Sequence, residues 1–258
     1  MRSDNARAWF SYAAAALLAA GGYFLLPMLF AGAELTLIEY YMLNAVQQLF
    51  LFVAPSILIL RARDARWQRF KMQLKKLTTD TTGYCMLLAV ACTVVISLVV
   101  ALWLPIVENM LGHVPEQTPL PDPTGAGEWL TALVCIAVVP AAAEELFFRG
   151  FVQNAVSKYF PRAAAAGTAL FFAALHIDIA ALPGLFLMGY LLGKTMERRG
   201  IFASMLLHAM YNAAVLLLNA RGGQIGSAAV WLCIFAFFFA VRRLLREGEN
   251  HAADGTGM

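Results

Sequence analysis

Long apolar stretches, separated by short polar segments, dominate this 258-residue sequence and restrict what it can fold into. A run of about 17 to 25 apolar residues is long enough to cross the roughly 30 Å hydrocarbon core of a bilayer as one helix. Eight candidate stretches cover residues 8–32, 40–60, 84–104, 129–147, 163–180, 181–196, 201–219 and 226–242. The sequence therefore predicts an all-α, polytopic membrane protein of about eight transmembrane helices.

The charged residues between these stretches alternate in sign along the chain. The segment after the second stretch, "RARDARWQRFKMQLKK", carries seven basic side chains, whereas the connection after the third stretch carries Glu108, Glu116, Asp122 and Glu128 and no Lys or Arg. Cytoplasmic loops of membrane proteins are rich in Lys and Arg. If the N-terminus, with Arg2 and Arg7, is cytoplasmic, every basic residue except Arg221 falls on the cytoplasmic side. We therefore expect both termini in the cytoplasm.

Residues 1–247 are predicted to form one integral membrane domain, followed by a disordered polar tail at 248–258. Arg2, Arg7 and the small residues at 31–33 also allow a signal peptide, but about 25 apolar residues exceed the usual core of such a peptide. Residues 61–82 are interpreted as a partly helical segment on the anionic inner leaflet or, equally, as a solvated loop. The cysteines, all within apolar stretches, are interpreted as core residues, and no pattern of a nucleic-acid binder occurs.

Three groups of polar residues interrupt the apolar stretches. They are Glu144, Glu145 and Arg149 in "AAAEELFFRG", His176 in "FFAALHIDIA", and His208 with Asn212 in "MLLHAMYNAA". Ionisable residues at membrane depth need a partner or a water-filled cavity, and they often mark functional sites. Taken singly, a buried His or Asn is more often a structural residue, so the site hypothesis depends on whether the three groups meet.

Spacing along the chain predicts that they do meet. The "KYFPRA" segment breaks the helix before Pro161, and Glu144 and His176 each lie 16 residues from Phe160. In a helical hairpin these two side chains lie at the same depth. Asn212 lies one helical turn beyond His208 on the same face. The sequence thus predicts that three helices direct these residues into one cytoplasm-facing cavity.

The two adjacent carboxylates are expected to have different roles. Glu145 and Arg149 are spaced i,i+4 with the acid first, the favourable order for an ion pair. Glu144 points about 100° further round the helix and is free to face His176. Pro140, four residues earlier, removes a backbone hydrogen bond and loosens the helix beside the site. Asp178 is expected to cap the outer end of its own helix.

Three ordered motifs then resemble those of a known family. "EELFFR" (144–149), "FAALH" (172–176) and "HAMYN" (208–212) are similar to the EExxxR, FxxxH and HxxxN motifs of the CPBP family of intramembrane proteases, which includes CAAX prenyl proteases of the Rce1 type and bacterial Abi proteins. The resemblance covers about 130–215. It implies that Glu144 activates a water with help from His176, that His208 and Asn212 stabilise the oxyanion, and that Glu145, Arg149 and Phe172 support the site.

The resemblance leaves the metal requirement and the substrate open. Glu144, His176 and His208 would form a zinc ligand set in an older interpretation of the family, but we favour a metal-independent mechanism because no HExxH helix occurs and Asn is a poor zinc ligand. The expected partners are the lipid bilayer and a membrane-associated protein or peptide substrate, with or without a lipid anchor. The compact chain indicates a bacterial plasma membrane. A catalytically inactive scaffold or bacteriocin self-immunity binder is the alternative, and nothing indicates the repeated halves of a transporter.

Overall fold

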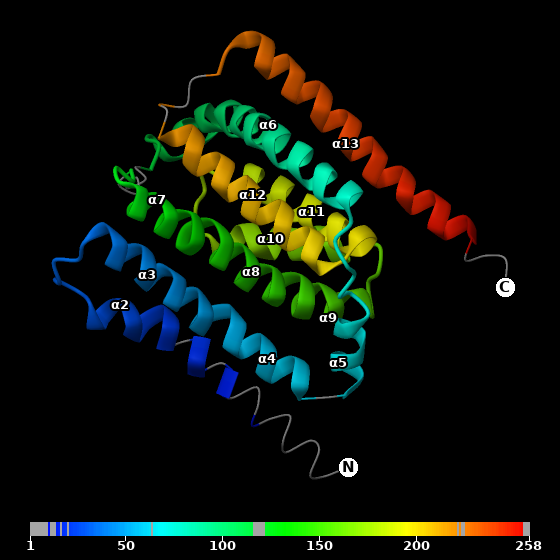
Figure 1. Ribbon diagram of the computed structural model, residues 1–258, viewed down its shortest axis with the longest axis horizontal. Coiled ribbons are helices and arrows are strands. Elements are labelled where there is room, and N and C mark those ends of the chain that lie inside the picture. The colour runs from blue at the N-terminus through cyan, green and yellow to red at the C-terminus, as the bar shows by residue number, and fades with distance from the viewer. Residues whose placement is uncertain are drawn as a thin grey trace.

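The computed structural model describes residues 10, 14–15, 17–19, 21–62, 64–115, 122–220, 222 and 225–254. Five of the charged residues used to predict the membrane orientation lie outside these ranges: Arg2, Arg7, Arg63, Glu116 and Arg221. Within the described ranges the structure is helical and contains no strand, so the all-α prediction is confirmed (Figure 1).

Five helical segments are long and apolar enough to cross a membrane, judged by length and composition. They correspond to the second, third, fourth, seventh and eighth expected stretches, and consist of α3 (Leu37–Gln48), η2 (Leu49–Val53) and α4 (Ala54–Arg61); α6 (Thr79–Leu111); α7 (Ala126–Ala132), η3 (Leu133–Val138), α8 (Val139–Glu145), η4 (Leu146–Gln153) and α9 (Asn154–Ser157); α12 (Ile201–Asn219); and α13 (Ser227–Asp254). The η elements are π-helical. Of the eight transmembrane helices expected, five are therefore supported by the structure.

The remaining stretches differ from full spans for identifiable reasons. Of the first, the structure describes only parts, among them η1 (Gly21–Leu25) and α2 (Leu26–Leu29). The fifth is the helix α10 (Ala164–Leu175), whose 12 residues extend about 18 Å. The sixth is α11 (Leu182–Arg199), whose last six residues include four charged ones. The break expected at Phe160–Pro161 is confirmed, since no helix occupies the chain between Ser157 and Ala164.

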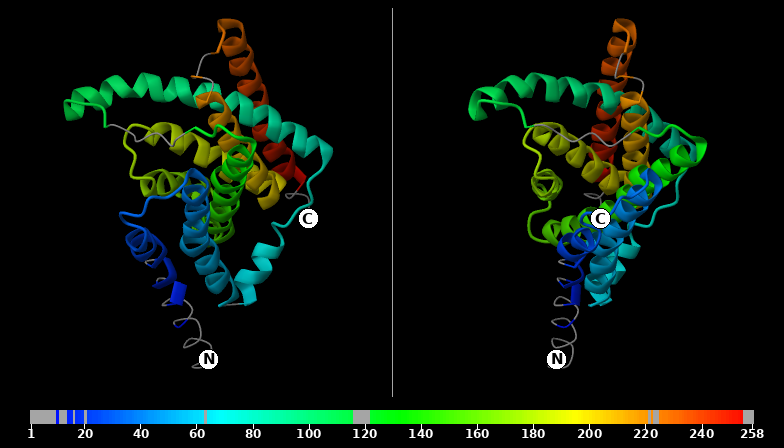
Figure 2. Two further views of the ribbon diagram at one scale, coloured as in Figure 1. Left: turned by 60° about the vertical axis from the view of Figure 1, so that its left-hand side comes forward. Right: turned by 90° about the vertical axis from the view of Figure 1, so that its left-hand side faces the viewer.

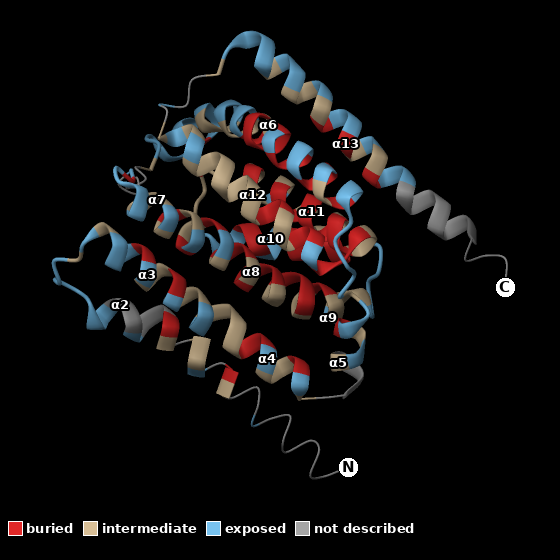
Figure 3. Cartoon of the chain, viewed as in Figure 1, coloured by how far each residue is buried: buried red, intermediate tan, exposed pale blue. Residues whose placement is uncertain are grey.

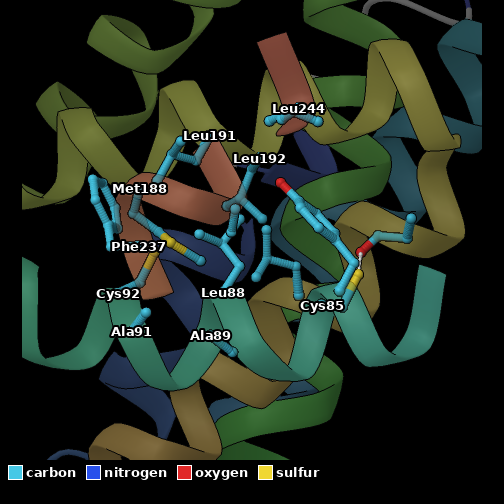
Figure 4. Packing of buried hydrophobic residues seen from close by; sticks show 14 of the residues in the cluster. Cys85, Leu88, Ala89, Ala91, Cys92, Met188, Leu191, Leu192, Phe237 and Leu244 are labelled. Atoms are coloured by element: carbon cyan, nitrogen blue, oxygen red, sulfur yellow. Dashed lines mark hydrogen bonds between the residues drawn. The ribbon is translucent and has the colours of Figure 1, made fainter. Parts of the chain in front are cut away.

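The core lies between α6, α11, α12 and α13. Cys85, Leu88 and Cys92 of α6 pack against Leu192 of α11 and Phe237 of α13, as Figure 4 shows. Burial is concentrated along α8, α10 and α11, while α13 exposes much of its surface (Figure 3). Cys135 is buried as well and Cys233 is partly buried, and all four cysteines are free, so their interpretation as apolar packing residues is confirmed.

Glycines allow α10 and α11 to pack closely as an antiparallel hairpin. A Cβ atom at Gly189 would lie 3.1 Å from Cα of Ala169, and one at Gly193 would lie 3.2 Å from Cβ of Ala165. Small residues spaced four apart let membrane helices approach to backbone contact. This approach also leaves the carbonyl groups of Gly189 and Gly193 within reach of polar side chains from the neighbouring helix, described below.

The basic segment after α4 is partly helical, as expected: α5 spans Asp64–Lys71. The chain that follows covers the turn between α11 and α12, where the backbone N–H of Ile201 donates to the carbonyl of Gln73 (3.0 Å). Gly200 in this turn has φ +89°, and a Cβ atom there would lie 2.8 Å from that same carbonyl oxygen. Glycine is therefore required at this position.

The boundary expected at residue 248 stays a prediction, and α13 runs across it. Helix α13 continues through Gly248 to Asp254, and residues 255–258 lie outside the described part of the chain. The segment contains helix-favouring Glu and Ala, and a single Gly inside a helix costs only about 1 kcal/mol. Low hydropathy marked the end of the apolar stretch, and the helix runs past it.

Candidate active site

The helix that carries the two glutamates alternates between α-helical and π-helical turns. η3 (Leu133–Val138) precedes Pro140, which lies in the first turn of α8, and η4 (Leu146–Gln153) follows Glu145. Proline lacks the N–H that would bond to the preceding turn. Single π-helical turns inside α-helices occur frequently at functional sites. The loosening expected beside Pro140 thus takes the form of wider π turns on both sides of Glu144 and Glu145.

The ion pair expected between Glu145 and Arg149 is confirmed. Nε of Arg149 lies 3.2 Å from Oε2 of Glu145, and both side chains are fully buried. Nη2 of Arg149 donates to the carbonyl of Gly189 on α11 (3.1 Å). The guanidinium also lies over the ring of Phe172, 5.3 Å from its centroid. The charge of Arg149 is therefore held by a carboxylate, a carbonyl and an aromatic face.

Glu145 has two further partners, both on α12. Its Oε1 lies 3.1 Å from Nδ1 of His208, and its Oε2 accepts a hydrogen bond from the hydroxyl of Ser204. Because an ionised carboxylate only accepts, Nδ1 of His208 must carry a hydrogen. Glu145 therefore joins its own helix to α12 and fixes the orientation of the His208 ring, in addition to pairing with Arg149.

Glu144 is buried but is left without such partners. Its side chain is directed toward α12, with Oε2 3.9 Å from Nε2 of His208. The residue is 7% exposed, and within the described residues Oε2 accepts no hydrogen bond. Buried polar atoms are nearly always hydrogen-bonded, and exceptions call for an explanation, of which a catalytic role is one. The two neighbouring glutamates thus differ: Glu145 pairs with Arg149 and accepts hydrogen bonds, whereas Oε2 of Glu144 approaches His208 at 3.9 Å without a hydrogen bond.

His176 ends α10 and is more exposed than the rest of the group. Its Nδ1 lies 2.8 Å from the carbonyl oxygen of Phe172. A carbonyl only accepts, so Nδ1 carries the hydrogen and Nε2 is left as an acceptor. Among the described residues no hydrogen bond or ion pair joins His176 to Glu144, so the meeting of these two side chains stays a prediction.

The ring of Phe172 contacts three of the candidate site residues. Its ring lies 4.5 Å from that of His176 and 5.9 Å from that of His208, measured between centroids, and it also covers Arg149. It thus packs against both imidazoles and covers the buried guanidinium, while the supporting role given to it stays a prediction.

Asn212 stands apart from this hydrogen-bonded group. It lies on α12 one helical turn beyond His208 and is half-buried. Its position on the same helix face as His208 is as expected, but among the described residues no hydrogen bond links it to Glu144, Glu145 or His208.

Two polar residues of the site region were missed by the sequence analysis. Ser204 lies four residues before His208, and Gln153 lies four residues after Arg149. Nε2 of Gln153 donates to the carbonyl of Gly193 (3.2 Å) and to Glu197 (3.0 Å). Polar residues at every fourth position, 145–149–153 and 204–208–212, were the available signal.

Asp178 was expected to cap the end of the helix that precedes it, and the structure places its hydrogen bonds elsewhere. Its carboxylate accepts hydrogen bonds from the backbone N–H groups of Ala180 (3.0 Å) and Ala181 (3.1 Å), just before α11. The end of a helix leaves carbonyl groups unpaired, whereas its start leaves N–H groups unpaired. A carboxylate can only accept, so Asp178 cannot pair with the carbonyl groups at the end of α10 and instead fixes the turn that leads into α11.

The residues of the alternative zinc ligand set, Glu144, His176 and His208, are not grouped around one point in this structure, and the metal requirement stays a prediction. Zinc requires its ligand atoms within about 2.0 to 2.3 Å of one point. Among the described residues no three His, Cys, Asp or Glu side chains are grouped so that they could hold a metal ion. The ring of Phe172 lies against both imidazoles.

Residues 126–214 match the model of a protein family described as Rce1-like, type II CAAX prenyl endopeptidase. The matched segment is about a third of the chain and contains every candidate site residue. Neither the curated proteins nor the solved structures include a significant match. The resemblance to CPBP proteases is thereby confirmed over this segment. It implies a protease of the CAAX type, and together with the five apolar helices it indicates an integral membrane protein.

Proposed function

We propose that this protein is an intramembrane endopeptidase in which Glu144 is the general base. The observation that carries the proposal is the division between the two adjacent carboxylates. Glu145 is engaged by Arg149, Ser204 and His208, whereas Oε2 of Glu144 is buried without a hydrogen bond among the described residues. A carboxylate free to accept a proton from water is what a general base needs.

Hydrolysis would begin when Glu144 takes a proton from a water molecule whose oxygen attacks the scissile carbonyl carbon. His176 offers Nε2 as a second acceptor for the same water, because its Nδ1 hydrogen is held by the Phe172 carbonyl. Glu144 would then pass its proton to the leaving amide nitrogen as the C–N bond breaks. Correctly placed acid–base groups of this kind accelerate reactions by about 10²- to 10⁴-fold.

The negative charge on the attacked carbonyl oxygen would be stabilised from α12. His208 donates from Nδ1 to Glu145, so a hydrogen on Nε2 as well makes it an imidazolium ion, which the Glu145 carboxylate stabilises. Such a cation, with the amide N–H of Asn212 one turn away, forms an oxyanion-binding pair. In this proposal Glu145 therefore supports catalysis through His208 as well as structure through Arg149.

We propose a membrane-associated protein or peptide as the substrate, taken from the lipid bilayer with or without a lipid anchor, since the matched family is described as prenyl endopeptidases. The distribution of Lys and Arg supports an orientation with both termini in the cytoplasm, and we propose a bacterial plasma membrane as the location.

We further propose that catalysis is metal-independent. The measurement is zinc content by mass spectrometry in active, detergent-purified protein, together with cleavage after treatment with a chelator. Full activity in zinc-free protein is expected. Stoichiometric zinc that is removed together with activity would contradict this part of the proposal.

The function itself is tested by comparing the membrane proteomes of cells that contain the wild-type protein or Glu144→Gln. This substitution keeps the shape of the side chain and removes the base. We expect a precursor that accumulates, or a cleavage fragment that disappears, in the variant. Glu108→Gln, at an exposed position near the end of α6, is the matched control. Identical proteomes for wild type and Glu144→Gln would instead favour a scaffold or self-immunity binder.

A further inference from the structure

The turn from His176 to Ala181 connects α10 to α11 and begins with a candidate catalytic residue. The last turn of α10 is weakly held by its own backbone: the N–H of His176 donates to Ala173 at 3.3 Å and that of Ile177 to Ala174 at 3.2 Å. Leu175 and His176 are both exposed. Helix ends of this kind fray unless other parts of the structure hold them.

Ile177 has an unfavourable backbone conformation in this turn. Its φ of +52° makes it the one non-glycine residue with positive φ in the described part of the chain. A β-branched residue in the left-handed region is an outlier. Its side chain is 78% exposed and so gains little from packing. Such conformations persist where the surrounding structure determines them, and they cluster at functional sites.

Two side chains fix the turn on the far side of Ile177. Asp178 accepts hydrogen bonds from the N–H groups of Ala180 and Ala181. The indole N–H of Trp103, on α6, donates to the carbonyl of Ile179 (2.8 Å). Figure 2 shows α6 running along the α10–α11 hairpin and continuing past its turn. The bond from Trp103 therefore ties the turn to the longest helix in the structure.

We propose that Trp103 is a positioning residue for His176, acting through the carbonyl of Ile179. The proposal rests on the proposed function, because it assigns Trp103 to the reaction in which His176 takes part. Trp103 lies outside the segment that matches the protease family. The His176–Ala181 turn is thus held by a helix outside the motif-bearing segment. A catalytic group displaced by about 1 Å can lose about 10²-fold in rate.

The test compares Trp103→Phe, which keeps an aromatic ring and removes the N–H donor, with Trp231→Phe, a control at an exposed position on α13. Hydrogen–deuterium exchange of residues 174–182 reports on the turn and needs no substrate. Cleavage is measured in liposomes with an internally quenched peptide that ends in a farnesylated CAAX sequence, and with the same peptide lacking the farnesyl group.

For Trp103→Phe we expect faster exchange in residues 174–182, unchanged exchange in residues 201–212, and a kcat lowered about 10- to 100-fold with KM unchanged. Trp231→Phe should resemble the wild type in all respects. Unchanged exchange in the turn would overturn the proposal, and so would faster exchange with an unchanged kcat. If the wild type cleaves neither peptide, the proposed function fails for this substrate class, and the exchange comparison alone then decides whether Trp103 holds the turn.

Discussion

The two parts of the candidate active site are held in place in different ways. Glu145, Arg149, Ser204 and His208 are buried and connected by ion pairs and hydrogen bonds within and between helices. His176 lies on an exposed turn at the end of a 12-residue helix. We call the first set the buried network and the second the exposed turn. In the buried network the site residues are also each other's structural partners, so stability and activity are coupled. In the exposed turn, a substitution can change activity without changing stability.

The largest effect on stability is expected for Arg149→Ala. This substitution leaves the fully buried carboxylate of Glu145 without its cation, and removing one partner of a buried ion pair costs about 3 to 5 kcal/mol. The measurement is thermal unfolding in detergent, with Arg242→Ala on the exposed face of α13 as control. If both variants unfold at the wild-type temperature, the buried network does not support the fold as described.

A smaller loss is expected for Ser204→Ala. The hydroxyl donates to an ionised carboxylate, and hydrogen bonds to charged groups contribute about 1.5 to 3 kcal/mol. Glu145 keeps Arg149 and His208, so the protein should fold, with a lowered unfolding midpoint and reduced cleavage. Ser97→Ala removes a hydroxyl that bonds only to its own helix, at the carbonyl of Thr93, and serves as control. Equal midpoints for the two variants would contradict the role given to Ser204.

The smallest effect on stability is expected for His176→Ala. An exposed side chain whose hydrogen bond is to its own helix should change the free energy of unfolding by no more than about 0.5 kcal/mol. Cleavage should nevertheless fall by about 10²-fold or more. Unfolding and cleavage are measured on the same preparation. A variant that loses stability and activity together would place His176 in the buried network and remove the distinction between the two parts.

Much of the fold and of the buried network could be predicted because both follow local rules. Hydropathy identified the five long spans, and the i,i+4 rule identified the Glu145–Arg149 pair. Hydropathy also joined α10 to the turn that follows it, because "HIDIAALPG" is too apolar to be recognised as a turn. The shorter length of α10 depends on Ile177 and on the Asp178 cap, which side-chain polarity alone did not indicate.

The remaining features depend on contacts between distant residues. Ser204 and Gln153 are uncharged, so they hardly alter the hydropathy of their helices, and their importance depends on what faces them from the neighbouring helix. Trp103 lies 76 residues from the carbonyl to which it donates. Its indole ring is apolar enough to pass for an ordinary membrane residue. Only the packing of α6 against the hairpin brings the two together.

The central claim is that Glu144, and not its neighbour Glu145, activates the water. The most direct measurement is the initial rate of peptide cleavage in liposomes by Glu144→Gln, with its thermal unfolding measured in parallel. We expect a rate lower by about 10³-fold or more and an unfolding midpoint equal to or above that of the wild type, since the substitution removes a buried charge that lacks a hydrogen-bonding partner on Oε2 among the described residues. A Glu144→Gln variant that cleaves at the wild-type rate would contradict the claim.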